Sequence, residues 1–439
     1  MRTVVKLKTG MHSGCVLVVL MGILVGCHDA GDTSRDAVVT GDSMVPSFWG
    51  EHVRAKCDQC RYSFRVAGEQ AEIPRQLVCP NCGDRSVDSA KAHPQPAQRV
   101  RVRRCRDVDG KLQIDRWDVV AVQASDDRPA MIKRVIGLPG ESIQFVDGDV
   151  FADGKLVRKL GHTARATRIL VFDSAYSSAD VLRRFVPRKP LGGKADSGSW
   201  SVRDGLWSYS PASQGETQWL AYEQWRCVSS GLPKDHVVSI EDWYEANVNV
   251  NRNLNKVKDI WARIEFRAAE ECQVEIAVSV GQKLLVYEID FGEGRVLFDG
   301  RIISFRGDDS SAADGTRGRK QPFRIEVCTF DRQLTMMVDG LGLPPVALPV
   351  SDGLAQPLPV IQIGGGETPL VMTRFRLWRD IHYFDHGVKN GTDGGNRLVA
   401  GPNEYLLVGD NVPVSIDSRH WPVPAVSGDD ILGTIDYQK

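Results

Sequence analysis

The sequence has almost no net charge, because 55 Lys and Arg residues are balanced by 56 Asp and Glu residues. A charge of −1 gives no overall field for nucleic acid, so no nucleic-acid partner is expected. An apolar run of the ~20 residues that a membrane-spanning helix needs is also missing, since the run at residues 14–26 has only 13. We find no repeat of fixed period and no long low-complexity stretch.

The composition is that of a globular protein, with 42% hydrophobic and 25% charged residues. A length of 439 residues is enough for about three domains. Ten cysteines in a chain of this length exclude a small scaffold held together by disulfides.

The first 27 residues predict export and a membrane tether. Arg2, Lys6 and Lys8 precede the short apolar run and acidic residues follow it, which places the N-terminus inside and the rest outside. The run is typical of a secretory signal, and its end, LVGC, resembles a bacterial lipobox that would make Cys27 the lipidated N-terminus. The alternative is an uncleaved signal anchor. Both place the chain at membrane lipid, on the extracytoplasmic (periplasmic) face of the cell membrane.

The rest of the chain predicts a mainly β fold in several parts. Residues 41–160 are strand-like, with a cysteine-bearing interruption at 54–86, and residues 400–439 again show strand and turn patterns. Residues 165–385 contain many short alternating runs between Gly, Asp and Asn, which favours a β-sandwich. Its expected strands include 260–266, 273–280, 284–289, 324–330 and 334–338.

Three short motifs carry candidate chemistry. Residues 41–47 (GDSMVPS) expose Ser43 in a turn stiffened by proline. In residues 131–141 (MIKRVIGLPGE), Lys133 shares a strand face with apolar neighbours, whose desolvation would lower its pKa and let it act as a base. Residues 409–419 (GDNVPVSIDSR) form a turn rich in hydroxyl and carboxylate groups.

In this order, the three motifs resemble the conserved boxes of bacterial type I signal peptidases. The resemblance covers residues 41–53, 105–160 and 400–437, and it implies a β catalytic core. It implies that Ser43 is the nucleophile and Lys133 the general base, a known variant of nucleophile-plus-base catalysis that needs no cofactor. It also implies that Ser415 orients the lysine, and that Asp417 and Arg419 form a supporting ion pair.

The same resemblance implies preprotein signal peptides as substrates, cut after small residues at the −3 and −1 positions. We expect the substrate to pair as an extended strand beside Asp118, Val119 and Val120, with Met44 also in contact with it. Trp117 stands where the family usually has glycine.

Two alternatives compete with this interpretation. A Ser-His-Asp hydrolase would use His420, but no Gly-x-Ser-x-Gly elbow is present. The chain could also be a catalytically vestigial relative, a surface protein whose lectin-like sandwich binds a sugar or a protein.

Four cysteines form two C-x-x-C pairs: Cys57, Cys60, Cys79 and Cys82. Their spacing predicts one structural zinc in a zinc ribbon at 54–86, with no open position for water. Two disulfides are the alternative, because the expected compartment is oxidising.

The insert at 165–385 resembles concanavalin-like and laminin-G-like sandwiches in its segments 323–340 and 373–378. A zinc ribbon together with such an insert resembles signal peptidase-like chains of planctomycete-type bacteria. All three motifs lie outside the insert, so we expect that its excision does not abolish peptidase activity. Its ligand would be a glycan or a protein.

Overall fold

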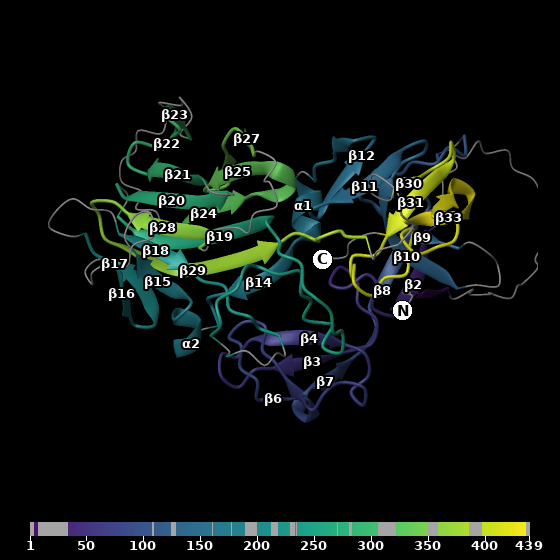
Figure 1. The fold of residues 1–439 in the computed structure, drawn as a ribbon, viewed down its shortest axis with the longest axis horizontal. Coiled ribbons are helices and arrows are strands. Elements are labelled where there is room, and N and C mark those ends of the chain that lie inside the picture. The colour runs from purple at the N-terminus through teal and green to yellow at the C-terminus, as the bar shows by residue number, and fades with distance from the viewer. Residues whose placement is uncertain are drawn as a thin grey trace, which may run out of the picture.

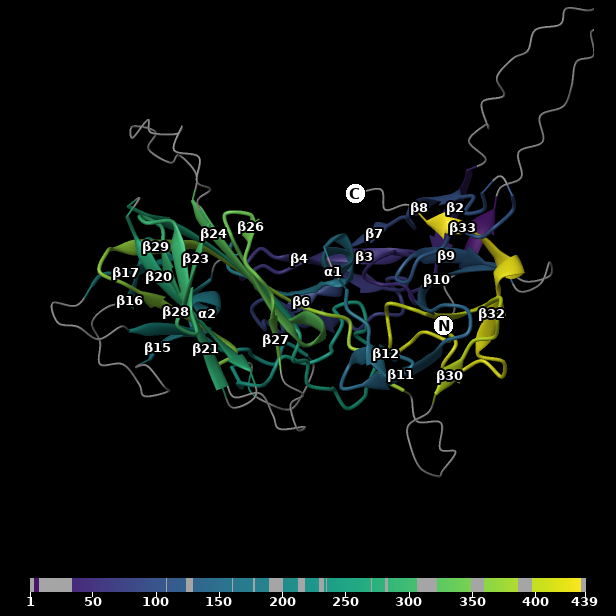
Figure 2. The ribbon, with the colours of Figure 1, turned by 90° about the horizontal axis from the view of Figure 1, so that it is seen from above.

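The computed structural model describes residues 4–7, 34–107, 109–123, 129–159, 161–176, 178–188, 200–211, 218–228, 233, 235–269, 271–280, 283–305, 322–348, 359–385 and 397–435. The fold is mainly β, as predicted. A sandwich lies at one end of the long axis, a core of shorter strands lies at the other, and a small sheet lies between them (Figures 1 and 2).

An eight-stranded sheet forms the core. Its order is β1 (Val4–Leu7), β2 (Arg35–Thr40), β8 (Arg99–Arg103), β33 (Ile431–Ile435), β9 (Val119–Val122), β10 (Ala130–Gly137), β31 (Glu404–Val408) and β32 (Ala425–Ser427). Strand β1 also pairs with β10. The strands β1, β2, β8, β33, β9 and β10 therefore form a closed ring of paired strands. Alternate side chains of these strands fill the interior, which is why the sequence shows period-two patterns here.

A four-stranded sheet lies next to the core sheet and continues from β10. Its order is β13 (Lys155–Leu156), β12 (Asp149–Ala152), β11 (Ser142–Val146) and β30 (Leu398–Val399). Its buried side chains share a cluster with the outer side of β10 and β31, including Ile136 and Leu406. Strand β30, from the C-terminal part of the core, pairs with β11, from its N-terminal part.

Two large sheets form the sandwich. One consists of β16 (Trp200–Arg203), β17 (Leu206–Tyr209), β29 (Leu370–Arg379), β19 (Ile260–Ala268), β24 (Phe323–Cys328), β25 (Gln333–Val338) and β26 (Leu341–Gly342), with β14 (Ile169–Asp173) on β29 and β27 (Val346–Ala347) on β25. The other consists of β15 (Phe185–Arg188), β18 (Trp219–Tyr222), β28 (Ile361–Gly365), β20 (Gln273–Val280), β21 (Lys283–Asp290), β22 (Arg295–Phe298) and β23 (Arg301–Ser304). The five strands expected from alternation are confirmed as β19, β20, β21, β24 and β25.

The cysteine segment forms two small sheets: β4 (Ser63–Ala67), β3 (His52–Lys56) and β7 (His93–Gln95), and the pair β5 (Gln76–Leu77) and β6 (Val87–Asp88). These sheets pack on the sandwich. The side chain of Asn81, in the cysteine segment, exchanges two hydrogen bonds of 2.8 and 3.1 Å with the backbone of Asp173, at the end of β14 in the sandwich. The hydrophobic core of the sandwich is therefore continuous with that of the cysteine segment.

Helices are short in the described residues. They are α1 (His162–Thr167) and α2 (Ala179–Leu182), with 3₁₀ turns at Ser89–Lys91, Phe330–Arg332 and Gly428–Asp430. In the part of the chain that the structure describes, no helix is long and apolar enough to cross a membrane. Cys27 and the apolar run before it lie outside the described residues.

The strand-like region 41–160 contains a turn directly before β9. Strand β9 begins only at Val119, because Trp117 adopts a positive φ of 78° and belongs to a turn. This conformation favours glycine, which is what the resembled family usually carries at this position.

Candidate active site

Three segments that are far apart in sequence bring Ser43, Lys133 and Ser415 together. Lys133, on β10, donates from Nζ to Ser43 Oγ and to Ser415 Oγ, each at 2.9 Å. Ser43 and Lys133 have no exposed surface, and Ser415 is 2% exposed. A hydroxyl and an amine in this arrangement have the geometry that a serine nucleophile and a general base require.

Behind Ser415, Asp417 and Arg419 form a buried ion pair. Arg419 donates from Nε and Nη2 to the two carboxylate oxygens of Asp417 at 2.8 and 2.7 Å. Burial alone would raise the pKa of Asp417, but the guanidinium of Arg419 holds it well below its usual range. Asp417 also accepts from the backbone N–H of Gly409 at 2.9 Å, which fixes the loop that carries Ser415.

Gly409 is required because the three segments meet there without space for a side chain. A Cβ at this position would lie 2.2 Å from Ser415 Oγ and 2.4 Å from the carbonyl oxygen of Ser43. Both contacts are shorter than any carbon atom tolerates. The close approach of the third motif to the Ser43 loop therefore depends on glycine.

A second buried ion pair lies next to the dyad and was not singled out from the sequence. Arg134 donates from Nε and Nη2 to Asp410 at 2.6 and 2.5 Å, and both side chains are at most 1% exposed. Ser47 also donates to Asp410. Arg134 follows Lys133 and Asp410 follows Gly409, so the pair ties the base strand to the third motif. The only signal in the sequence was that both residues lie inside the motifs.

The insert also reaches this site. Tyr244 donates from its hydroxyl to the backbone carbonyl of Asp410 at 2.8 Å, and its ring is buried beside Val408 and Val412. Burial raises the pKa of Tyr244 to about 12, so the hydroxyl stays protonated as a donor. The insert therefore contacts the third motif in the folded chain although the motifs lie outside it in sequence, and the expected tolerance of its excision stays a prediction. Nothing in the local sequence around Tyr244 indicated this contact.

The residues expected to bind substrate are placed differently. Met44 is fully buried in the interior of the core sheet, together with Val119. Strand β9 pairs with β10 on one side and with β33 on the other, so Val119 and Val120 have no free edge. The prediction that a substrate strand adds beside Asp118, Val119 and Val120 is wrong, because the sheet order makes β9 an internal strand.

A different pair of edges lies beside the dyad. Strand β1 lies between β2 and β10, with Val4 opposite both Thr40 and Met131. Thr40 is three residues before Ser43, and Met131 is two residues before Lys133. The backbone edges that flank the two reactive side chains are thus those that β1 occupies.

His420 lies near Asp417 Oδ1, whereas the backbone N–H of Gly409 donates to Asp417 Oδ2. Its Nδ1 is 3.6 Å from Asp417 Oδ1, and its side chain is 28% exposed. The base within 2.9 Å of Ser43 is Lys133, so the described geometry matches a Ser-Lys dyad better than a Ser-His-Asp triad.

The four cysteines expected to bind metal lie in one cluster. Cys57 Sγ is 3.6 Å from Cys82 Sγ, and Cys60 Sγ is 3.6 Å from Cys79 Sγ. All four sulfurs lie within 4.8 Å of one another. A tetrahedral zinc with Zn–S bonds of ~2.3 Å separates its sulfurs by roughly 3.8 Å, whereas a disulfide requires ~2.05 Å. The cysteines are not disulfide-bonded and their geometry fits a metal.

The loop after the second cysteine pair has the conformation that this geometry needs. Gly83 has a φ of 77°, and its N–H donates to the carbonyl of Cys79 at 2.9 Å. A residue with a side chain would be strained at this φ, so Gly83 allows the turn that brings Cys79 and Cys82 to the same side.

Three carboxylates, Asp149, Asp259 and Asp331, form another cluster between the core and the insert. Two protein cations lie among them: Arg332 donates to Asp149 at 2.7 Å, and Lys159 contacts both Asp331 and, at 2.9 Å, a fourth carboxylate, Asp380. Burial and the neighbouring carboxylates raise the pKa of Asp259. This cluster is an ion-pair network that joins β12 of the core to the sandwich.

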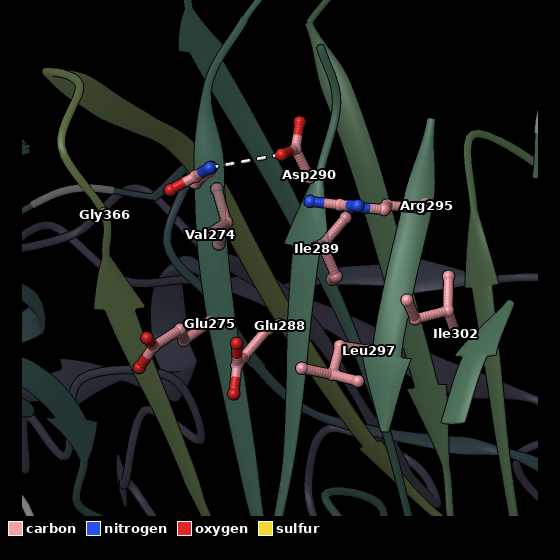
Figure 3. Close-up of a pocket in the computed structure, with 10 residues that line it drawn as sticks. Val274, Glu275, Glu288, Ile289, Asp290, Arg295, Leu297, Ile302 and Gly366 are labelled. Carbon is pink, nitrogen blue, oxygen red and sulfur yellow. Dashed lines mark hydrogen bonds between the residues drawn. The ribbon is translucent and has the colours of Figure 1, made fainter. Parts of the chain in front are cut away.

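The sandwich has a groove of about 200 Å³ on the strands β20, β21 and β22 (Figure 3). Glu275 and Glu288 stand directly opposite each other on β20 and β21. Asp290, which accepts from Gln273 at 3.1 Å, and Arg295 lie at one end of the groove. Like charges placed opposite each other in a sheet are unfavourable.

Residues 78–237, a little over a third of the chain, match the family model described as signal peptidase, peptidase S26. This match supports a relationship to signal peptidases over a segment that contains Lys133 but neither Ser43 nor Ser415. No curated protein matches the chain.

Among solved structures, the chain is similar to a carbohydrate esterase from the Shiga toxin-encoding bacteriophage phi24B, with 11% identity, 48% of this chain and 99% of that chain covered, and a TM-score of 0.26. It is also similar to a sialidase, with 10% identity, 62% of this chain and 21% of that chain covered, and a TM-score of 0.27. These TM-scores are too low to indicate a shared fold.

Proposed function

We propose that this chain is a serine endopeptidase that removes signal peptides from exported preproteins. The observation that carries the proposal is the buried contact of 2.9 Å between Lys133 Nζ and Ser43 Oγ. The match of residues 78–237 to a signal peptidase family model supports the same reaction class.

In the proposed mechanism, Ser43 Oγ attacks the carbonyl carbon of the scissile peptide bond. Lys133 must be uncharged to accept the hydroxyl proton, and complete burial favours the uncharged amine because it removes water from the ammonium. Ser415 accepts from Lys133 and keeps Nζ directed at Ser43. No metal or cofactor takes part in this step.

Breakdown of the tetrahedral intermediate breaks the C–N bond and leaves an ester on Ser43. The departing amine takes the proton that Lys133 received. Water then attacks the ester carbonyl while Lys133 accepts one of its protons. The bond between Ser43 Oγ and the acyl carbon breaks, Lys133 passes that proton to Ser43 Oγ, and the product leaves as a carboxylic acid that loses its remaining proton to solvent.

We place the substrate on the backbone edges of β2 and β10 rather than beside β9. Both edges flank the dyad, and both pair with β1 in the structure described above. An extended segment in place of β1 would pair with the backbone at Thr40 and Met131, near Ser43 and Lys133 in the sequence, which is the β-addition mode of peptide recognition. The preference for small residues at −3 and −1 follows from the resemblance to the peptidase family.

The test is cleavage of a peptide with an Ala-x-Ala site by the full chain. Ser43→Ala and Lys133→Met should each abolish cleavage, and Lys133→Arg should not restore it, because arginine stays charged at any accessible pH. Lys91→Met is the matched control, since Lys91 is exposed and forms only a surface ion pair with Asp58. Full activity of Ser43→Ala would refute the proposal.

We propose that the cysteine cluster holds one structural zinc. Cys57, Cys60, Cys79 and Cys82 would be its four ligands, and four thiolates leave no position for a reactive water. The metal would fix the loop between β3 and β4, which carries Cys57 and Cys60, to the loop between β5 and β6, which carries Cys79 and Cys82.

We further propose that the chain is tethered at membrane lipid on the extracytoplasmic face, through a lipidated Cys27 or an uncleaved anchor. This position would place the dyad on the side where exported preproteins emerge.

The second candidate is a vestigial peptidase whose sandwich binds a glycan or a protein. The groove between Glu275 and Arg295 favours it, because its carboxylates could accept hydrogen bonds from hydroxyl groups. Calorimetric titration of the full chain with neutral oligosaccharides tests it. Binding that Glu275→Gln weakens, together with no cleavage of the Ala-x-Ala peptide by the wild-type chain, would favour this candidate.

A further inference from the structure

A stretch of the insert, residues 244–247, packs on the loop of the third motif. Tyr244 holds the carbonyl of Asp410, and three residues later Asn247 meets the side chain of Asn411. Asn247 and Asn411 are separated by 164 residues in sequence. The insert therefore contacts the loop at two successive residues, Asp410 and Asn411.

The two asparagine side chains form a reciprocal pair. Asn247 Nδ2 donates to Asn411 Oδ1 at 2.7 Å, and Asn411 Nδ2 donates to Asn247 Oδ1 at 2.9 Å. Such a pair couples the orientations of the two amides and occupies Asn411 Oδ1 and one N–H of its Nδ2, so that it holds the Asn411 side chain in place.

Asn411 in turn holds the nucleophile loop. It is fully buried, its Nδ2 donates to the carbonyl of Asp42 at 3.0 Å, and its backbone N–H donates to the carbonyl of Ser43 at 3.0 Å. If the amide of Asn411 turned over, its oxygen would face the carbonyl of Asp42, and two acceptors would repel each other. The carbonyl of Asp42 thus sets the orientation of the Asn411 amide, and the pair with Asn247 holds the side chain in that orientation.

We propose that Asn247 is a positioning residue for the nucleophile, acting through Asn411 on the backbone of Asp42 and Ser43. This inference rests on the proposed peptidase function. Asn247 belongs to the insert at residues 165–385. The insert therefore takes part in setting the geometry of Ser43 and Lys133. Misplacing a reacting group by ~1 Å can cost a factor of about 100 in rate.

The experiment measures kcat and KM of the full chain on the Ala-x-Ala peptide for Asn247→Ala. We expect kcat to fall about 10- to 100-fold with KM within about twofold, because the nucleophile is misplaced while the substrate edges remain. Asn249→Ala is the matched control, since exposed Asn249 lies two residues away and donates only to the carbonyl of Glu72. It should keep the wild-type kcat.

A double variant separates positioning from general loss of structure. In an Asn411→Ala background, Asn247→Ala should cause no further loss of kcat, because its path to Ser43 is already cut. The midpoint of thermal unfolding of Asn247→Ala should stay close to that of Asn249→Ala.

Three results would overturn the inference: a wild-type kcat in Asn247→Ala, a loss that only follows the folded fraction, or losses that multiply in the double variant. The Ser43→Ala arm keeps the two proposals distinct. If Ser43→Ala is inactive and Asn247→Ala is fully active, only the positioning role fails, whereas an active Ser43→Ala variant refutes the peptidase dyad itself.

Discussion

Asp410→Asn should destabilise the protein strongly, because it removes the charge that balances a buried guanidinium. Arg134 makes two hydrogen bonds to Asp410, at 2.6 and 2.5 Å, and neither side chain is more than 1% exposed. Arg134 also donates from Nη1 to the carbonyl of Trp117 at 2.7 Å and from Nη2 to Ser47 Oγ at 3.5 Å, and both of these partners are uncharged. In the variant, an amide of the same shape would replace the carboxylate, and one end of it would present N–H groups to the guanidinium.

Breaking a buried ion pair by removing one partner costs about 3–5 kcal/mol, because the other charge stays buried without compensation. A protein of ordinary stability has about 5–15 kcal/mol in total, so this loss should be a large part of it. By contrast, Asp235→Asn should cost less than about 1 kcal/mol. Asp235 pairs with Arg183 at 3.2 Å, but their side chains are 44% and 58% exposed.

The assay is urea denaturation followed by far-UV circular dichroism, combined with hydrogen exchange of the amides of β10, which report on the region around Arg134. The double variant Arg134→Met/Asp410→Asn should be less destabilised than the sum of the single variants, because it leaves no unpaired charge. If Asp410→Asn lies within about 1 kcal/mol of the wild type, or if the single effects add, the buried pair does not carry the energy assigned to it.

The remaining predictions concern packing, pH, metal and processing. Gly409→Ala should abolish cleavage, measured with the Ala-x-Ala peptide, because its Cβ would collide with the Ser415 hydroxyl; retained activity would contradict the described approach of the loops. Burial raises the pKa of Glu245 to about 7, so stability should be full below pH ~4.5 and fall by up to about 3 kcal/mol as the pH rises to ~7. Glu245→Gln should remove that part of the pH dependence of urea unfolding, and an unchanged profile would argue against it. Elemental analysis should find one zinc per chain, and chelation should increase hydrogen exchange in β3 and β4, since small zinc modules fold with their metal; absence of zinc with oxidised C-x-x-C pairs would exclude the site. Mass spectrometry should find Cys27 as a diacylated N-terminus, and an intact peptide across Gly26 and Cys27 would leave the anchor alternative.

Local sequence determined the β class and most strands of the sandwich. Alternation of apolar and polar residues reports directly on which face of a strand is buried, so β19, β20 and β21 could be predicted from their own residues. The same holds for the cysteine cluster, because two C-x-x-C turns each bring two thiols to one side regardless of the rest of the fold. The candidate dyad could be named because its three motifs resemble a known family.

Sheet order could not be predicted, since it depends on which strands meet after the chain has closed. Strand β9 looked like an edge that a substrate could join, but β33, from the last residues of the described chain, pairs with it. The edges beside the candidate dyad are instead those of β2 and β10, with which β1 pairs. No pattern within β9 distinguishes an edge strand from an internal one of the same composition.

Only the tertiary structure brought the insert to the active site. Tyr244 and Asn247 lie in a segment without a motif, and their partners Asp410 and Asn411 follow more than 160 residues later. Hydrogen bonds between such distant residues depend on how whole sheets pack, and this packing leaves no periodic signal in the sequence. The motifs therefore identify the groups that could react, while the contacts among Asn247, Asn411 and Ser43 decide how those groups are held.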